Sequence, residues 1–425
     1  MTNVVVTGIG AVTPAGVGVA PLWDVVSNGR SLQERLQNSD ERTMLNEFDF
    51  VSDAICELHD LGDHLDSLPQ EVRRQDRFIQ FAALAALEAV ADAGLDKDHV
   101  GGPRTALSLA TAICGTPTME REFLKATNSG ADPIDPNAVS SDLYLASMSN
   151  TPAVLLSAML GVQGPAFTLS TGCVGGIDAI GAAYELIADG EADVVIAGAS
   201  EAPITPITVA AFEIIKCLSS NFADSPNTAS RPFDADRNGF VLAEGAGFLV
   251  LESAEHALAR GADPYMAVDG FALTSNAKHM TDLVADGDDL ARAMELALDR
   301  SQAGPQDIDH VNAHGSSTVQ NDRCETTAIK RTLGDQAYKV PVTSLKSMIG
   351  HPLSAASAVE LVVCAKSFRE AFLPPTANYE TPDPDCDLNY VPNSGIEWQG
   401  TRILKQANGF GGLHAAMTLH ATEKG

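Results

Sequence analysis

One cysteine lies where a nucleophile would be expected. Cys173 sits in the turn 171–176, after the apolar segment 166–170 and before a helix predicted over 175–188. A helix N-terminus carries a partial positive charge, which favours a thiolate over a thiol. The glycines of the turn would let a substrate approach the backbone, where N–H groups could hold an oxyanion. The competing interpretation is a buried structural cysteine, since Cys is among the most buried residue types.

Two histidines and a lysine also follow predicted strands. His314 lies in the polar turn 312–318, and His351 precedes a proline in the first turn of another predicted helix. The positive helix end would lower the pKa of His351, and a neutral imidazole can donate a hydrogen bond to a carbonyl oxygen. Lys346 lies five residues before His351, with Glu360 as one partner for a buried ammonium. A capped turn histidine and a solvated surface lysine remain the ordinary alternatives.

A glycine-rich turn at 408–412 follows another predicted strand. Gly409 and Gly411 flank Phe410, which would let its ring swing and expose its N–H group. A plain hairpin turn is the simpler interpretation of this segment alone. Ligand sites in α/β proteins gather beyond the carboxyl ends of strands, where all these turns occur. A cysteine nucleophile with two neutral histidine donors suits acyl transfer through a thioester.

Short apolar strands alternate with small-residue helices, and these elements must position the reactive side chains. The predicted strands are 4–6, 105–110, 166–170, 194–198, 248–251, 308–312, 340–344 and 402–407. The predicted helices are 74–93, 175–188, 286–303, 324–333 and 353–370. This alternation indicates an α/β protein with largely parallel sheets covered on both faces.

Two parts of the chain repeat one local order of strand, polar turn, reactive residue and helix. The first contains Cys173, and the second runs from Lys346 to His351. A predicted helix ends at 255–261, and this end marks the boundary between the two parts. The sequence therefore predicts two similar halves, 1–258 with Cys173 and 259–425 with His314, Lys346 and His351.

The composition excludes several classes of partner. The 425 residues carry 27 basic and 56 acidic side chains, a formal net charge of −29. Nucleic acids and anionic membrane surfaces need a basic footprint, which this chain lacks. With 45% hydrophobic and 20% charged residues, the chain can still bury a substantial core.

The cysteine pattern and the N-terminus bear on compartment. None of the seven cysteines forms a CxxC pair, so neither a disulfide framework nor a metal site is expected. The first residues lack a basic segment followed by a long apolar stretch, and no 18-residue apolar run is uninterrupted. The prediction is a cytoplasmic protein without a membrane span.

Taken together, the motifs are specific. The chain resembles the β-ketoacyl-acyl carrier protein synthases of the thiolase superfamily along nearly its whole length. The resemblance rests on the segments 5–10, 74–78, 171–173, 229–234, 239–245, 312–315, 346–351, 374–376 and 409–412. It implies an α/β thiolase fold, with two similar βαβαβ halves in a five-layer αβαβα arrangement.

Within that family the chain is most similar to the catalytic ketosynthase subunits of bacterial type II polyketide synthases. The supporting segments are 201–208, 237–242 and 320–326, together with Gly172 before the cysteine. The related chain-length factor usually lacks the cysteine, so Cys173 with both histidines favours the catalytic member.

The resemblance implies a role for each motif residue. Cys173 would take an acyl chain as a thioester, and His314 and His351 would stabilise the enolate formed when a malonyl group loses CO2. Phe410, with Gly409 and Gly411, would supply an oxyanion donor and a gate. The remaining implied residues are Lys346 as organiser of the site, Glu360 and Asp322 as its supports, and Ser316 and Thr318 as contacts of the phosphopantetheine arm.

The resemblance also implies the partners. The enzyme would need no cofactor of its own, because its substrates arrive on the phosphopantetheine arm of acyl carrier protein. A chain-length factor would complete a heterodimer, and otherwise the chain would form a homodimer of the fatty-acid type. A non-catalytic subunit and a Cys-His hydrolase are further candidates, but a hydrolase would not explain Lys346 or the second histidine. A dinucleotide-binding motif at 8–13 lacks its third glycine and is rejected.

Four positions depart from the family pattern. Val174 follows the cysteine where relatives commonly have Thr or Ser, and Asn408 occupies the place of a second Phe. Leu413-His414 replaces Thr-Asn. Phe222 stands where many relatives carry an Arg that meets the acidic carrier protein. Docking would then depend on a partner or on another basic patch, of which 73–77, with three arginines, is the densest.

Overall fold

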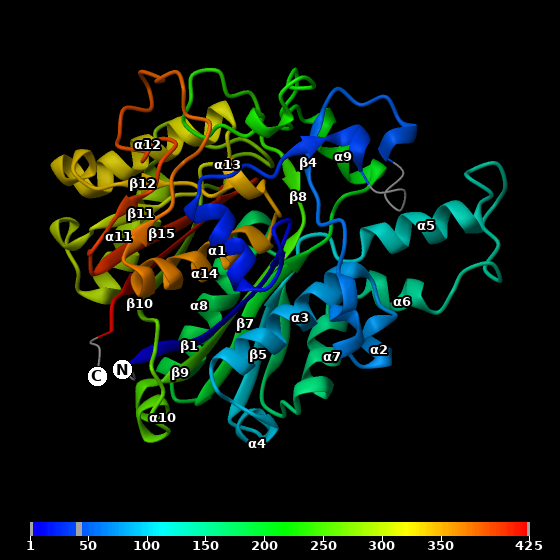
Figure 1. The fold of residues 1–425 in the computed structure, drawn as a ribbon, viewed down its shortest axis with the longest axis horizontal. Coiled ribbons are helices and arrows are strands. Elements are labelled where there is room, and N and C mark those ends of the chain that lie inside the picture. The colour runs from blue at the N-terminus through cyan, green and yellow to red at the C-terminus, as the bar shows by residue number, and fades with distance from the viewer. Residues whose placement is uncertain (1–2, 40–44, 423–425) are drawn as a thin grey trace.

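A long mixed sheet organises the computed structural model, which describes residues 3–39 and 45–422 (Figure 1). Five of its strands come from the first half of the chain and lie in the order β6-β5-β7-β9-β1. Their bounds are β1 Val4–Thr13, β5 Thr105–Ala110, β6 Ala166–Leu169, β7 Val194–Glu201 and β9 Gly245–Ser253. The neighbours β6-β5-β7 are parallel, whereas β7-β9-β1 are antiparallel.

The second half repeats this arrangement. Its strands lie in the order β12-β11-β15-β16-β10, with β10 paired to β1. Their bounds are β10 Met266–Ser275, β11 His310–Asn312, β12 Val342–Thr343, β15 Arg402–Gly409 and β16 Leu413–His420. The neighbours β12-β11-β15 are parallel, and β15-β16-β10 are antiparallel. Strand order and direction are thus the same in both halves, which is the internal duplication of the thiolase fold.

Helices form three layers around the two half-sheets (Figure 1). Helices α8 (Gly175–Ala188) and α14 (Ala355–Glu370) pack against each other in the middle layer. Helix α3 (Arg77–Asp92) covers β1, β9 and β7 from outside. Helices α11 (Asp288–Ser301) and α12 (Val319–Leu333) lie together on the far side, with α11 against β10 and β16. The order of layers is αβαβα, as predicted.

Smaller elements complete the described part of the chain. The further helices are α1 Val19–Ser27, α2 Gln70–Arg73, α4 Lys97–Val100, α5 Thr116–Ala126, α6 Asp142–Ser147, α7 Thr151–Leu160, α9 Pro206–Ile214, α10 Ala254–Ala259 and α13 Lys346–Ile349. The further strands are β2 Gly16–Val17, β3 Glu34–Arg35, β4 Ala54–Cys56, β8 Leu242–Ala243, β13 Phe372–Leu373 and β14 Ile396–Glu397.

Three large apolar clusters hold the layers together. One joins α3 to its half-sheet through Phe78, Phe81 and Phe248. A second fills the middle layer between the half-sheets, and a third packs α11 and α12 on the second half-sheet. At roughly 25 cal/mol per Å² of buried apolar surface, such clusters provide most of the driving force for folding.

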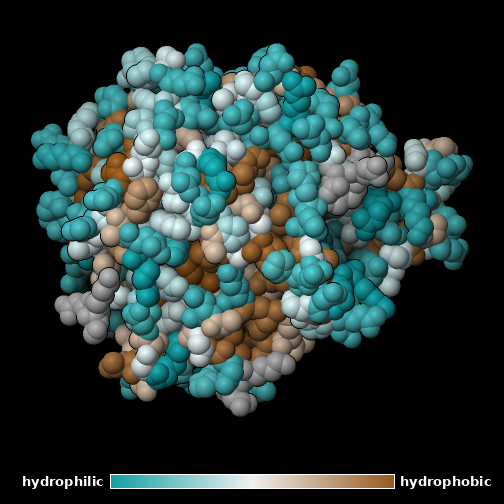
Figure 2. Space-filling view, viewed as in Figure 1, coloured by the Kyte–Doolittle hydropathy of each residue, from teal (hydrophilic) through white to brown (hydrophobic). Residues whose placement is uncertain are grey.

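Figure 2 shows a largely hydrophilic face with smaller apolar patches between the polar side chains. None of the helices in residues 3–39 and 45–422 is both long and apolar enough to cross a membrane.

Two details of the secondary structure differ from the prediction. The sheet is mixed rather than largely parallel, because the pairs β1–β9 and β10–β16 are antiparallel. The lengths of the apolar runs in the sequence do not show the direction in which strands pair. The helix predicted over 74–93 begins three residues later, as α3 at Arg77. The carboxylate of Asp76 accepts a hydrogen bond from the backbone N–H of Phe78 and so begins α3 at Arg77.

Candidate active site

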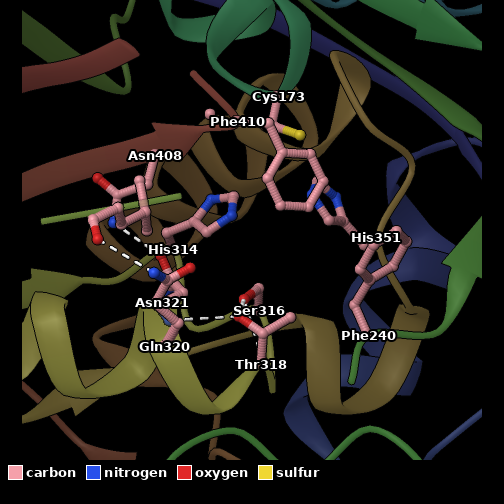
Figure 3. A pocket seen from close by; sticks show the side chains of 12 residues that line it. Cys173, Phe240, His314, Ser316, Thr318, Gln320, Asn321, His351, Asn408 and Phe410 are labelled. Carbon is pink, nitrogen blue, oxygen red and sulfur yellow. Dashed lines mark hydrogen bonds between the residues drawn. The ribbon is translucent and has the colours of Figure 1, made fainter. Parts of the chain in front are cut away.

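The turns singled out in the sequence meet in one pocket between the two halves (Figure 3). Its lining combines a thiol, two imidazoles, hydroxyls, amides and aromatic rings. The lining residues are Cys173, Phe240, Leu283, His314, Ser316, Thr318, Gln320, Asn321, His351, Asn408, Gly409 and Phe410.

Cys173 occupies a single 3-10 turn, Gly172–Val174, directly before α8. Gly172 has a φ of +61°, a left-handed conformation that glycine adopts without strain. Its carbonyl accepts a hydrogen bond of 2.8 Å from the Ser354 hydroxyl at the start of α14. The turn is therefore fixed from the other half of the chain, and the Cys173 side chain is 8% exposed.

The start of α8 is pressed against α14. A Cβ atom at Gly176 would lie 2.7 Å from both the Ala358 N and the Ser354 O, so only glycine fits there. The Gly176 N–H donates to the Ser354 carbonyl at 3.0 Å, and the Ile177 N–H donates to the Ser357 hydroxyl at 2.9 Å. These helix-terminal N–H groups are already bonded, so they are not free for a thiolate as the sequence suggested.

The surroundings of Cys173 hold it as a thiol. Burial raises its pKa to about 11, with the Glu201 carboxyl adding to the rise. The Lys346 ammonium and the backbone N–H groups of Phe410 and Cys173 act in the opposite direction. Both N–H groups belong to residues that line the pocket, and an oxyanion formed at Cys173 requires N–H donors of this kind.

This thiol should show a steep pH dependence of alkylation. Below a pKa of about 11 the thiolate fraction grows tenfold per pH unit. We expect the rate of Cys173 alkylation by iodoacetamide to rise about tenfold per unit between pH 7 and pH 9. Peptide mass spectrometry would follow Cys173 separately from the other cysteines. A rate that levels off near pH 7 would contradict this assignment.

His314 is held in the turn after β11 by a buried carboxylate. Its backbone N–H donates to Glu325 Oε1 at 2.6 Å, and the Gly315 N–H donates to Glu325 Oε2 at 2.8 Å. Burial lowers the pKa of His314 well below its usual range, and the Lys346 ammonium adds to this effect. Its ring is therefore neutral at physiological pH and can donate a hydrogen bond to an oxygen in the pocket.

His351 faces His314 across the pocket. The two ring centroids are 5.2 Å apart and the ring planes meet at 82°. The backbone N–H of His351 donates to the Val241 carbonyl at 2.8 Å. The imidazole packs edge-on against the Phe240 ring, with 5.1 Å between the ring centroids. Burial and then Lys346 lower its pKa well below the usual range. Helix α14 begins only at Ala355, so burial is the main cause, rather than the helix end inferred from the sequence.

Lys346 lies behind the two histidines and is 1% exposed. Its Nζ donates to the His314 carbonyl at 2.7 Å and pairs with Glu360 Oε1 at 2.5 Å. The second oxygen of Glu360 pairs with Lys405 Nζ at 2.7 Å. Two ammonium groups thus share one carboxylate, and the Glu325 carboxyl is a further acidic group near Lys346.

Phe410 lies at the tip of the turn between β15 and β16 and is 36% exposed. Figure 3 shows its ring between Cys173 and His351. Gly411 and Gly412 have φ values of +82° and +69°, which makes this turn dependent on glycine. Gly409 also lines the pocket, whereas Gly411 is not among the lining residues.

Ser316 and Thr318 border the same pocket. Their hydroxyl oxygens are 2.9 Å apart, and the Thr318 oxygen caps α12 by accepting from the Asn321 N–H at 3.3 Å. Thr318 begins α12 at Val319, five residues before the predicted start.

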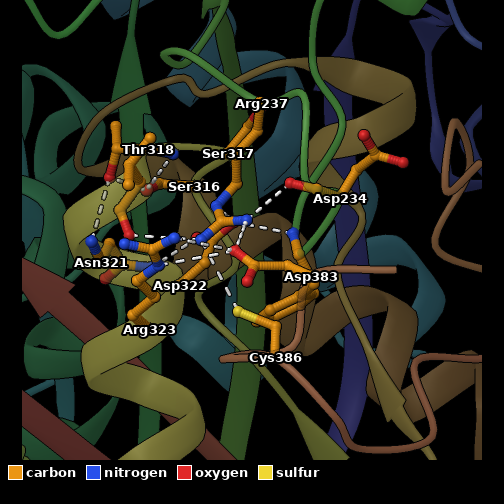
Figure 4. A network of polar contacts seen from close by, with 12 residues as sticks. Asp234, Arg237, Ser316, Ser317, Thr318, Asn321, Asp322, Arg323, Asp383 and Cys386 are labelled. Carbon is orange, nitrogen blue, oxygen red and sulfur yellow. Dashed lines mark hydrogen bonds and ion pairs between the residues drawn. The ribbon is translucent and has the colours of Figure 1, made fainter. Parts of the chain in front are cut away.

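Asp322 does not face the pocket. It is fully buried behind it in an ionic network with Arg237, Asp383 and Arg323 (Figure 4). Its Oδ2 accepts from the Phe233 N–H at 2.8 Å and lies 3.3 Å from Arg237 Nε. Asp322 therefore braces the start of α12, at a distance from the reacting groups.

The proposed basic patch at 73–77 is largely neutralised. Arg77 is only 15% exposed and pairs with Glu244 at 2.9 Å, while Arg73 pairs with Asp66 at 2.8 Å. Phe222 packs under the guanidinium of Arg231, 5.9 Å from the ring centroid.

Sequence reasoning missed four functional contributors. Lys405 and Glu325 are buried charges that reach the site from distant strands and helices, whereas Phe240 and Asn321 line the pocket. The run 320–326 was noted as a family motif, and the spacing of Asn321 and Glu325 on one helix face could have identified this pair.

Comparison with known proteins agrees with this geometry. Residues 1–257 match the family model described as "Beta-ketoacyl synthase, N-terminal domain", and residues 265–380 match the corresponding C-terminal domain. A "Putative polyketide beta-ketoacyl synthase 1" from Streptomyces halstedii is 46% identical over 423 residues, 99% of each chain. A "3-oxoacyl-[acyl-carrier-protein] synthase 2" from Coxiella burnetii is 35% identical, covering 98% of each chain.

Two solved structures are also similar. One, described as a type II polyketide synthase acyl-carrier protein in complex with its ketosynthase bound to the hexaketide, has a TM-score of 0.92 and 40% identity. The similarity covers 99% of this chain and 100% of the chain in that structure. The ishigamide ketosynthase/chain length factor has a TM-score of 0.89 and 30% identity, with 99% of each chain covered. The chain belongs to the β-ketoacyl synthase family, and it is a condensing enzyme of the acyltransferase class.

Proposed function

We propose that the chain elongates a polyketide by decarboxylative Claisen condensation of malonyl-acyl carrier protein with an acyl chain held on Cys173. The observation that carries this proposal is that one pocket brings the Cys173 thiol together with Phe410 and with the rings of His314 and His351, whose centroids are 5.2 Å apart. The similarity to type II polyketide ketosynthases at 40% and 46% identity supports the choice of substrate class.

In the first step the Cys173 sulfur attacks the thioester carbonyl of an acyl-carrier protein. A new C–S bond forms, the bond to the phosphopantetheine sulfur breaks, and the thiol proton passes to that leaving sulfur. The N–H groups of Cys173 and Phe410 stabilise the tetrahedral oxyanion. Ser316 and Thr318 supply hydroxyls along the path of the arm, and Phe410 acts as the gate to the cysteine.

In the second step malonyl-carrier protein loses CO2. The electrons of the broken C–C bond form an enolate, whose oxygen accepts hydrogen bonds from His314 and His351. The Lys346 ammonium, which lies behind both histidines, favours this anion. The enolate carbon then attacks the Cys173 thioester, and Cys173 leaves as a thiolate that takes up a proton from solvent to restore the thiol. The chain is then longer by two carbons.

We further propose that the active form is a heterodimer with a chain-length factor. Strand β6 leads to Cys173 and ends the strand order of the described sheet, and its first residue, Ala166, is exposed. Apolar side chains on the neighbouring segment 116–154 are more than half exposed, namely Phe123, Ile134, Tyr144 and Val154. A partner covering them would remove a large apolar surface from water.

The alternative is a homodimeric 3-oxoacyl-acyl carrier protein synthase of the fatty-acid type, which the 35% identical relative favours. Product analysis with and without a co-expressed chain-length factor separates the two. The heterodimer predicts long polyketide products only in the presence of the partner. Full activity of this chain alone would contradict it.

Lys216 is proposed to meet the acidic carrier protein. It is exposed beside a hollow that shares Thr318, Gln320 and Phe410 with the active-site pocket, next to Ile214 at 81% exposure. We expect Lys216→Glu to raise the Kd for carrier protein about tenfold at low salt, and less at high salt. Lys339→Glu, which changes an exposed charge outside this hollow, is the control. An equal effect of both variants would exclude a local contact.

We also propose the division into halves 1–258 and 259–425, supported by family matches that end at 257 and resume at 265. A cytoplasmic location is proposed on the seven free thiols, which suit a reducing compartment.

A further inference from the structure

Two of the positions that depart from the family pattern contact each other. Asn408 and His414 are cross-strand partners on β15 and β16, and each is 2% exposed. His414 Nδ1 and Asn408 Oδ1 are 3.0 Å apart. Burial lowers the pKa of His414 to about 4, so its ring is neutral at physiological pH. Since an amide oxygen only accepts, the imidazole carries its proton on Nδ1 and donates to Asn408.

The other end of the Asn408 amide reaches α12. Asn408 Nδ2 donates to Asn321 Oδ1 at 2.9 Å (Figure 3). Asn321 Nδ2 in turn donates to Glu325 Oε2 at 3.2 Å, and to Asp322 Oδ1 at 3.0 Å. Because Glu325 holds the backbone of His314, four side chains connect the β15–β16 hairpin to the histidine turn.

We propose that Asn408 is a positioning residue, which fixes the Phe410 turn relative to His314 through Asn321. This inference rests on the proposed function. Phe410 follows Asn408 by two residues, in a turn made flexible by three glycines. Phe410 lines the same pocket as Cys173, so a shift of the turn would misplace its backbone N–H relative to the sulfur. A displacement of about 1 Å at such a donor can cost on the order of 100-fold in rate.

The chemistry of the bridge explains why Asn408 and His414 occur together. An apolar side chain at position 408 would remove the partner of the Asn321 side-chain oxygen Oδ1 and of the His414 ring Nδ1–H, both of which are inside the protein. Buried polar groups without partners are strongly disfavoured, and a partly satisfied network is worse than none. The bridge therefore replaces apolar packing at the base of the gate with directional hydrogen bonds.

A double-mutant cycle tests the proposal. The rate of Cys173 acylation by a purified acyl-carrier protein would be measured by mass spectrometry for the wild type, Asn408→Ala, Asn321→Ala and the double variant. We expect each single change to lower the maximal acylation rate about tenfold, as a misplaced donor would, without raising the carrier-protein concentration for half-maximal rate. The double variant should be no slower than the slower single variant, because both remove one connection.

Conservative variants separate positioning from simple destabilisation. His414→Gln keeps a donor for Asn408 Oδ1 and should retain the wild-type acylation rate, whereas His414→Leu, which leaves the Asn408–Asn321 bond in place, should slow acylation less than Asn408→Ala does. Thr327→Ala, on α12 and outside the pocket, controls for substitutions on that helix. Thermal unfolding of all variants identifies any that fail to fold.

The outcomes are distinct. Multiplying effects in the double variant, or wild-type acylation by a folded Asn408→Ala, would overturn the positioning role. If the wild-type protein is not acylated at all, the proposed function is refuted. The positioning role is tested by comparing the variants with a wild type that does react.

Discussion

Replacement of Cys173 by alanine is expected to abolish condensation, with a fall of at least about 1,000-fold, because removal of a catalytic nucleophile has effects of this order or greater. The thioester intermediate cannot form without the sulfur. The histidine side of the pocket is unchanged, so Cys173→Ala should still release CO2 from malonyl-carrier protein. The measurement is product formation and CO2 release from the same sample.

The matched control is Cys324→Ser. Cys324 is a buried thiol on α12 that donates to the Val284 carbonyl at 3.2 Å and does not line the pocket. A serine hydroxyl can make the same contact, so condensation should stay near the wild-type rate. Unchanged condensation by Cys173→Ala would remove the catalytic role assigned to this cysteine.

Glu360→Gln is expected to have the largest effect on stability. Glu360 is 1% exposed and is the carboxylate partner of both Lys346 and Lys405. Removing one member of a buried ion pair leaves uncompensated charge, at a typical cost of about 3–5 kcal/mol. Urea unfolding would measure the loss. Activity should fall as well, because Lys346 would no longer be fixed at the His314 carbonyl.

The same helix offers the control for this change. Glu370 pairs with Lys366 near the end of α14 and is 43% exposed. Glu370→Gln should change the free energy of unfolding by less than about 1 kcal/mol, as is usual for surface pairs. If Glu360→Gln lowered the free energy of unfolding as little as Glu370→Gln, the buried group of Lys346, Glu360 and Lys405 would not have a dominant role in stability.

Local pattern was sufficient to predict much of the fold. Strand β5 and helix α8 have the predicted bounds, because apolar runs and glycine boundaries are local signals. The antiparallel pairing of β1 and β10 depends on contacts between distant segments, so periodicity could not predict it.

The same contrast between local sequence signals and contacts of distant segments holds for the site. Cys173, His314, His351, Ser316, Thr318, Gly409 and Phe410 line one pocket, as their positions after strands suggested. Lys405 was missed because a lysine within an apolar strand gives no local sign of a partner 45 residues away. The N–H groups in the first turn of α8, which were expected to be free, are instead bonded to Ser354 and Ser357. Burial raises the pKa of the Cys173 thiol, and this tertiary effect gives no local sign in the sequence.

The decisive measurement is mass spectrometry of the protein after incubation with acyl-carrier protein. We expect a mass increase equal to one acyl group, located on the peptide that contains Cys173 and released when malonyl-carrier protein is added. Product formation without an adduct, or with the acyl group on a different residue, would contradict this expectation.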